Sequence, residues 1–184
     1  MLKPQLSNLD DLIRNCKTGN LQYQEMLYKH FYGYALGVCL RYLINRDDAL
    51  EAANDAFIKA FKYLNTFKEG ADFKPWFRKI LVNTSLDYKR KNMRFNQAIE
   101  MTDTEQQTTY SSAVDQLSVK DILSLMKNLN ETQHLVFNLY EIDGYTHKEI
   151  GEMLNIPESS SRTYLSRAKQ ILQNLLITHS IYTK

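Results

Sequence analysis

Hydrophobic residues recur at intervals of three and four positions along most of the chain, the spacing that gives a helix one apolar face. Alternation over several residues, which a half-buried strand requires, is hard to find. The clearest helical run follows Asp47 and consists of small and aromatic residues: Ala49, Ala52, Ala53, Ala56, Phe57, Ala60, Phe61 and Leu64. With only 3 prolines and 6 glycines in 184 residues, the pattern predicts an all-α protein.

Two groups of helices are predicted, one on each side of a segment without periodicity. In the first group, Pro75 occupies a first helical position, where its missing N–H costs nothing, and the helices cover residues 7–17, 20–44, 47–64 and 75–91. Residues 101–112 are polar and slightly acidic, which favours a flexible linker over an irregular loop within one domain. The second group begins with helices at residues 122–129 and 135–142, the latter ending near Gly144.

Residues 146–169 predict two short helices joined by a tight turn. Thr146 and Glu149 form a T-x-x-E capping box at the start of the first helix, and Gly151 is small enough to let a second helix approach closely. Pro157 cannot continue that helix, and Ser159 or Ser160 can cap the next one.

The second of these helices separates apolar residues from polar ones. Leu165, Ala168 and Leu172 share one side. The other side carries hydroxyl, amide and guanidinium groups, which can bond phosphates and base edges: Ser159, Thr163, Ser166, Arg167 and Gln170, with Arg162 on the flank. The segment therefore predicts a DNA-binding helix-turn-helix rather than a helical hairpin with a merely solvated face. It completes two small helical domains, residues 1–94 and 116–184, joined by a flexible linker at residues 95–115.

The charge of the chain adds a second candidate surface. The net charge is only +2, but residues 1–91 carry 15 Lys and Arg against 10 Asp and Glu, a net charge of +5. In residues 65–94, aromatic rings lie among these cations, as single-stranded nucleic acid requires for stacked bases and paired phosphates. The alternative is that the rings are core and the charges serve solubility. We call this set the aromatic-basic surface: Phe67, Lys68, Phe73, Trp76, Lys79 and Asn83.

A stripe of carboxylates lies on the helix at residues 47–64, away from its alanine face. We call these carboxylates, together with the amide of Asn54 beside them, the acidic stripe: Asp48, Glu51, Asn54 and Asp55. Exposed carboxylates are common and individually weak, so the residues alone favour a solvated face over a docking surface for a basic partner helix.

Catalytic and metal chemistry is not indicated. Cys16 and Cys39 fit neither a disulfide framework nor a metal-ligand spacing, so we expect reduced core cysteines. No glycine-rich phosphate loop or nucleophile motif accompanies the scattered His30, His134, His147 and His179. We expect no catalytic residue, metal, cofactor or small-molecule substrate. Without a signal peptide or a membrane-spanning apolar run, we also expect a cytoplasmic protein with no membrane insertion.

Two segments of the first domain, Asp47 to Phe61 (DDALEAANDAFIKAF) and Phe73 to Lys91 (FKPWFRKILVNTSLDYKRK), resemble region 2 of bacterial sigma factors. The helix-turn-helix resembles their region 4, and no region 3 or long N-terminal extension is visible. This plan is similar to the extracytoplasmic-function (ECF) group of the primary sigma family. The resemblance implies a protein that binds core RNA polymerase, directs promoter-specific transcription initiation and catalyses nothing itself.

The resemblance also implies a role for each surface. The acidic stripe would dock on the coiled coil of the polymerase β′ subunit, which reverses the preference for a solvated face. Within the aromatic-basic surface, the loop at residues 65–72 would capture a flipped base of the minus-ten element, and Trp76, Lys79 and Asn83 would help to melt and hold that element. The minus-thirty-five element would be recognised in the major groove by what we call the recognition face: Ser159, Ser160, Arg162, Thr163, Ser166 and Arg167. Expected partners are promoter DNA and core RNA polymerase, including its β flap, with an anti-sigma factor as a further candidate.

Three positions depart from the family pattern. Ser161 falls on the buried side of the recognition helix, where valine is usual, and we expect its hydroxyl to bond back to the backbone. Tyr164 stands where a basic residue is common, and Leu50 replaces a usual acidic residue. The competing hypothesis is a stand-alone helix-turn-helix regulator that binds duplex operator DNA. The aromatic-basic surface counts against it, because an operator repressor has no use for a single-strand pocket.

Overall fold

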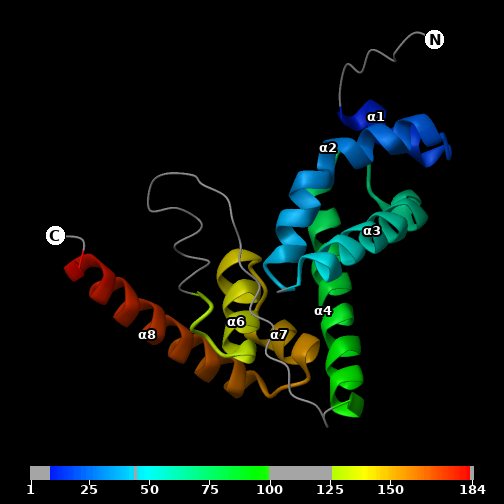
Figure 1. Ribbon diagram of the computed structural model, residues 1–184. Coiled ribbons are helices and arrows are strands. Elements are labelled where there is room, and N and C mark those ends of the chain that lie inside the picture. Colours follow the sequence, from blue (N-terminus) through cyan, green and yellow to red (C-terminus); the bar gives the residue numbers. More distant parts are fainter. Residues whose placement is uncertain (1–8, 44, 100–125, 183–184) are drawn as a thin grey trace. The chain divides into compact units, whose positions relative to one another are not determined.

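The computed structural model describes residues 9–43, 45–99 and 126–182, and the chain divides into two units, Met1–Thr108 and Thr109–Lys184 (Figure 1). Every regular element in the described ranges is a helix. The all-α fold predicted from the sequence is therefore confirmed. Within these ranges, no helix is long and apolar enough to cross a bilayer.

Four α-helices build the described part of the first unit. They are α1 (Leu9–Lys17), α2 (Leu21–Leu40), α3 (Arg46–Tyr63) and α4 (Phe73–Ile99), with a short 3-10 turn, η1 (Leu64–Thr66), after α3. Both α2 and α4 pack against α3, and α4 crosses α3 at an angle (Figure 1).

The core of this unit joins the alanine face of α3 to a cluster of phenylalanine rings. The alanines of α3 are buried, so neighbouring helices can approach closely. The ring centroids of Phe57 and Phe77 lie 4.8 Å apart, and those of Phe31 and Phe73 lie 4.9 Å apart. Burying each such ring contributes roughly 1.5–3 kcal/mol, more than an exposed ion pair does. Hydrophobic packing therefore holds α2, α3 and α4 together.

Helix ends differ from the predicted ones where side chains cap the backbone. The Asp72 carboxylate accepts a hydrogen bond from the Lys74 N–H at 3.1 Å, so α4 begins at Phe73 and Pro75 is its third residue. Proline is tolerated there because first-turn N–H groups have no partner within the helix. At its other end α4 continues to Ile99, into the predicted linker. Residues 100–115, the rest of that linker, lie outside the described residues.

The predicted cysteine environment is confirmed, since Cys16 and Cys39 are both buried and free. Burial raises the pKa of each thiol to about 11. Both therefore remain protonated at neutral pH and behave as small apolar core residues.

The second unit contains α6 (Glu131–Phe137), which continues into a π-helical turn, η2 (Asn138–Ile142), followed by α7 (His147–Leu154) and α8 (Glu158–Tyr182). The helix predicted at residues 122–129 lies largely outside the described residues. At its end, Met126 and Leu129 pack with Ala168 and Leu172 of α8 in the core. The next helix starts at Glu131, before the apolar run that predicted it, because Asn130 and Gln133 form a capping box.

Candidate nucleic-acid and polymerase interfaces

Helix α7, the first helix of the predicted helix-turn-helix, has the predicted start and a sharply defined end. Thr146 Oγ1 accepts from the Glu149 N–H at 3.3 Å, and Glu149 Oε2 accepts from the Thr146 N–H at 2.8 Å, which confirms the capping box. Asn155 ends α7 in the left-handed conformation, with φ of 54°. Asparagine tolerates that conformation better than most residues, so the chain can reverse within a few residues.

Gly151 is required by the turn itself. A Cβ atom added there would lie 2.8 Å from the carbonyl oxygen of Ile156 and 3.5 Å from the backbone nitrogen of Glu158. The sequence predicted a close approach of the second helix. The tightest contact is instead with the backbone of the turn, and the first residue of α8 comes next.

We expect Gly151→Ala to destabilise the second unit by about 1–3 kcal/mol, because the added methyl group meets backbone that cannot move aside. Urea unfolding of the full chain, followed by circular dichroism, measures this. Gly37→Ala in α2 is the matched control, since its Cβ would meet nothing within 4 Å. That change should stabilise by about 0.5–1 kcal/mol through helix propensity. Equal effects of the two substitutions would contradict the steric role of Gly151.

The recognition helix begins earlier than predicted. Helix α8 starts at Glu158, and the Pro157 carbonyl accepts from the Ser160 N–H at 3.0 Å and the Ser161 N–H at 3.2 Å. The predicted cap at Ser159 or Ser160 is therefore wrong: both lie inside the first turn. All members of the recognition face are exposed except Ser160, which is half-buried.

Two contacts shape that face. The Thr163 hydroxyl donates to the Ser159 carbonyl at 3.0 Å, and Arg162 forms an exposed ion pair with Glu158, one turn earlier. Such an exposed pair is weak, so the guanidinium can exchange Glu158 for a phosphate at small cost.

Ser161 is fully buried, but its hydroxyl does not bond back to the backbone as predicted. It lies 2.9 Å from Nδ1 of His147, the first residue of α7, and so joins the two helices of the motif. The His147 ring also stacks on Tyr140, with centroids 4.4 Å apart. The valine that is usual in the family could not make this hydrogen bond. His147 thus supplies the partner that a buried serine hydroxyl needs at this position.

Burial, and then the charge of Arg162, lowers the pKa of His147 below its ordinary value of 6.5, against an opposing effect of Glu158. The folded unit thus prefers neutral His147, and the unfolded chain binds its proton more readily. This contribution to stability is complete above pH 6.5 and is lost as the pH falls below it.

We therefore expect amide protection in α7 of the full chain to fall as the pH is lowered below about 6.5. Hydrogen exchange, corrected for its intrinsic pH dependence, measures this. His147→Gln removes the titrating group and should abolish that part of the pH dependence. An unchanged pH profile in the variant would show that another group is responsible.

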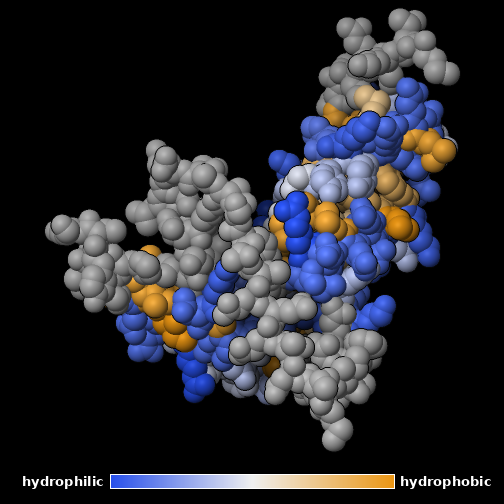
Figure 2. Space-filling model, viewed as in Figure 1, coloured by the Kyte–Doolittle hydropathy of each residue, from blue (hydrophilic) through white to orange (hydrophobic). Residues whose placement is uncertain are grey.

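The acidic stripe lies along α3 and is only partly exposed. Glu51 and Asn54 are exposed, whereas Asp48 and Asp55 are half-buried. One turn beyond Asn54, Ile58 exposes 65% of its surface, which sequence analysis did not single out. The visible surface of the described residues is largely hydrophilic, with separate apolar patches on each unit (Figure 2).

The aromatic-basic surface separates into a buried layer and an exposed one. The rings of Phe67 and Phe73 are buried at 4% and 2% exposure, so neither presents a face to solvent. Trp76 is half-buried and rests on both, with ring centroids 5.4 Å from Phe67 and 5.5 Å from Phe73. The exposed layer consists of Lys68, Lys79 and Asn83.

The loop that carries Phe67 is anchored by a residue that sequence analysis missed. Lys17 at the end of α1 donates to the Phe67 carbonyl at 3.0 Å and lies 3.6 Å from the Glu69 carboxylate. No local pattern could have indicated this contact, because the two partners are 50 residues apart. The loop after α3 is thus held in place by the buried ring of Phe67 and by the contacts of Lys17 from α1.

Each of the two units matches a known protein family. Residues 27–95 match the model of Sigma-70 region 2, and residues 112–172 match that of Sigma-70, region 4. These are the two regions indicated by the sequence, in the same order.

Relatives in several bacteria share most of the chain. The ECF RNA polymerase sigma-E factor of Haemophilus influenzae is 21% identical over 179 residues, covering 89% of this chain and 92% of its own. The ECF RNA polymerase sigma factor SigW of Bacillus subtilis is 28% identical over 151 residues, covering 76% of this chain and 81% of its own.

Solved structures show the same fold. The sigma factor RpoE of Bartonella quintana, solved with the anti-sigma factor NepR, gives a TM-score of 0.59 at 20% identity, covering 83% of this chain and 95% of that chain. CnrH, solved with the cytosolic domain of CnrY, gives 0.51 at 19% identity, covering 92% of this chain and 97% of that chain. This chain belongs to the ECF sigma factors, transcription initiation factors that direct RNA polymerase to specific promoters.

Proposed function

We propose that residues 1–94 hold core RNA polymerase and the melted minus-ten element, that residues 116–184 recognise the minus-thirty-five element, and that residues 95–115 link them. The observation that carries this assignment is the position of Trp76. Its half-buried ring packs on Phe67 and Phe73, and the exposed Lys79 and Asn83 follow on the same helix at the spacing of one and two turns. A packed ring on a helix that also exposes a cation and an amide is suited to stacking an unpaired base.

The burial of Phe67 and Phe73 refines their part in this proposal. Both buried rings pack against Trp76 and hold the loop in place. The residues that contact the single DNA strand directly are then Lys68, Trp76, Lys79 and Asn83. Extruding a base costs a few kcal/mol, which stacking on a ring that is already ordered can offset.

For polymerase docking we propose the acidic stripe together with Ile58. An apolar side chain at the end of a row of carboxylates gives an interface both buried area and charge complementarity. The exposed members of the recognition face lie on α8, immediately after the tight turn, as a helix entering the major groove requires.

Further assignments follow from family membership. RpoE of Bartonella quintana and CnrH were each solved with a partner, an anti-sigma factor in the first case. We propose an anti-sigma factor as a regulator of this chain as well, and a cytoplasmic location, where polymerase and promoters are found. We further propose that the chain catalyses no reaction of its own.

Binding to promoter duplex, with and without core polymerase, separates this function from that of a stand-alone regulator. We expect weak binding by the protein alone and tight, sequence-specific binding of the complex with core enzyme. Tight operator binding by the protein alone, unaffected by core enzyme, would favour the regulator instead.

A further inference from the structure

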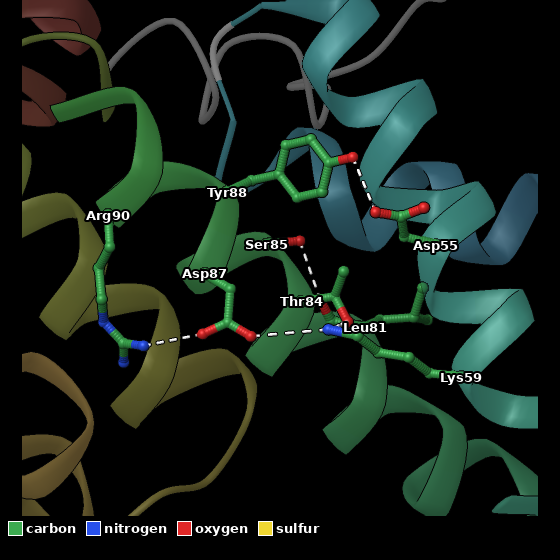
Figure 3. A network of polar contacts seen from close by, with 8 residues as sticks. All are labelled: Asp55, Lys59, Leu81, Thr84, Ser85, Asp87, Tyr88 and Arg90. Atoms are coloured by element: carbon green, nitrogen blue, oxygen red, sulfur yellow. Dashed lines mark hydrogen bonds and ion pairs between the residues drawn. The ribbon is translucent and has the colours of Figure 1, made fainter. Parts of the chain in front are cut away.

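Two members of the acidic stripe each accept a hydrogen bond from a tyrosine on a neighbouring helix. The hydroxyl of Tyr28 on α2 donates to Asn54 Oδ1 at 3.1 Å. The hydroxyl of Tyr88 on α4 donates to Asp55 Oδ2 at 2.8 Å (Figure 3). Both neighbours of α3 therefore supply one donor each to adjacent residues of the stripe.

The Tyr88 hydroxyl on α4 stays protonated. Burial raises the pKa of Tyr88 to about 12, and the hydrogen bond to Asp55 and the nearby carboxylates act in the same direction. The hydroxyl therefore remains a donor across the physiological pH range. A carboxylate accepts several hydrogen bonds, so donation to one oxygen orients Asp55 and leaves capacity for a partner.

The donor on α2 is held by ring packing. The Tyr28 ring lies 4.6 Å from the buried Phe57 and 5.4 Å from Tyr32, measured between centroids. These contacts fix the direction of the hydroxyl, and the hydrogen bond to Asn54 transmits that direction to an otherwise exposed amide.

The relative position of α3 and α4 is fixed one turn further along. Lys59 Nζ donates to Thr84 Oγ1 at 3.2 Å and lies 3.6 Å from the Asp87 carboxylate, while Ser85 Oγ donates back to the Leu81 carbonyl (Figure 3). Of these, only the Lys59 contacts join the two helices, since the Ser85 bond lies within α4. Together with the packing of Phe57 on Phe77, they keep Tyr88 close to Asp55 independently of the hydrogen bond between these two residues.

We propose that Tyr28 and Tyr88 are positioning residues for polymerase docking: their hydroxyls hold Asn54 and Asp55 in the orientations that core enzyme binds. This inference rests on the proposed docking role of the acidic stripe. Side chains ordered before binding lose less conformational entropy on association. Without either hydroxyl, its partner side chain must be ordered during docking, so affinity for core enzyme falls.

The test is a double-mutant cycle on affinity for core polymerase with the full chain. Tyr88→Phe keeps the ring and removes only the donor, and we expect it to weaken binding about three- to tenfold. In an Asp55→Ala background the same change should have no further effect, because no carboxylate is left to position. Tyr28→Phe and Asn54→Ala form the parallel cycle. Tyr32→Phe is the matched control, since the Tyr32 hydroxyl forms no hydrogen bond with Asn54 or Asp55.

The outcomes distinguish the docking role of the acidic stripe from the positioning role of the two tyrosines. Loss of affinity in Asp55→Ala and Asn54→Ala, with coupled losses in the tyrosine variants, supports positioning. Loss in the alanine variants alone overturns the inference and leaves the docking role intact. No loss in the alanine variants overturns both. Tyrosine effects that persist undiminished in the alanine backgrounds also overturn it, because they show that the hydroxyls act on the fold and not through the stripe.

Discussion

Trp76→Ala will leave the initial complex with duplex promoter nearly intact and will reduce strand opening about 5- to 150-fold, because stacking is worth roughly 1–3 kcal/mol per base. The reason is structural: Phe67 and Phe73 are buried, so Trp76 is the only aromatic ring of the aromatic-basic surface that reaches solvent. Reactivity of thymines to permanganate, compared with binding of the holoenzyme to the same DNA, separates the two steps.

Two controls sharpen this experiment. Trp76→Phe keeps a stacking face and should restore most of the opening, which would exclude a mere loss of packing. Arg167→Ala, on the recognition face, should weaken the initial complex and leave opening per bound complex unchanged. Equal losses in both steps for Trp76→Ala and Arg167→Ala would contradict the division of promoter recognition between the two units.

Glu51→Lys will lower affinity for core polymerase by about 100-fold or more, because like charges at an interface cost several kcal/mol. Glu51 is exposed on α3 and accepts no hydrogen bond from Tyr28 or Tyr88, so its reversal changes charge without disturbing those contacts. Fluorescence anisotropy of the labelled protein, titrated with core enzyme at two salt concentrations, measures the effect.

The salt series identifies the cause of that loss. Affinity of the unmodified protein should fall as salt screens the acidic stripe, and the fall should be smaller for Glu51→Lys. Asp10→Lys on α1 makes the same change in net charge away from the stripe and should leave core affinity nearly unchanged. A similar loss in Asp10→Lys would point to long-range charge rather than to docking.

Local signals predicted much of this fold correctly. The capping box at Thr146 and Glu149 and the alanine face of α3 depend on residues within a few positions of one another, so sequence spacing reveals them. Helix ends were less accurate, because α4 begins at a cap from Asp72 and α8 directly after Pro157. The capping box of Asn130 and Gln133 contains neither Ser nor Thr, so the usual sequence signature does not indicate it.

Contacts between distant residues account for what the sequence could not indicate. The bond between Ser161 and His147 crosses the helix-turn-helix, and the donation from Tyr88 to Asp55 spans two long helices. Spacing alone also could not separate buried from exposed rings in the aromatic-basic surface, since Phe73 and Trp76 both lie among cations. Only the packing of α4 against α2 and α3 distinguishes them.

The most direct test of the account is transcription in vitro from fragmented genomic DNA of the source organism, using core polymerase with and without the protein. We predict a set of transcript starts that depend on the protein and share two upstream elements at a constant spacing. Trp76→Ala should reduce transcription from those same starts. Starts that are identical in the presence and absence of the protein would contradict promoter-specific initiation.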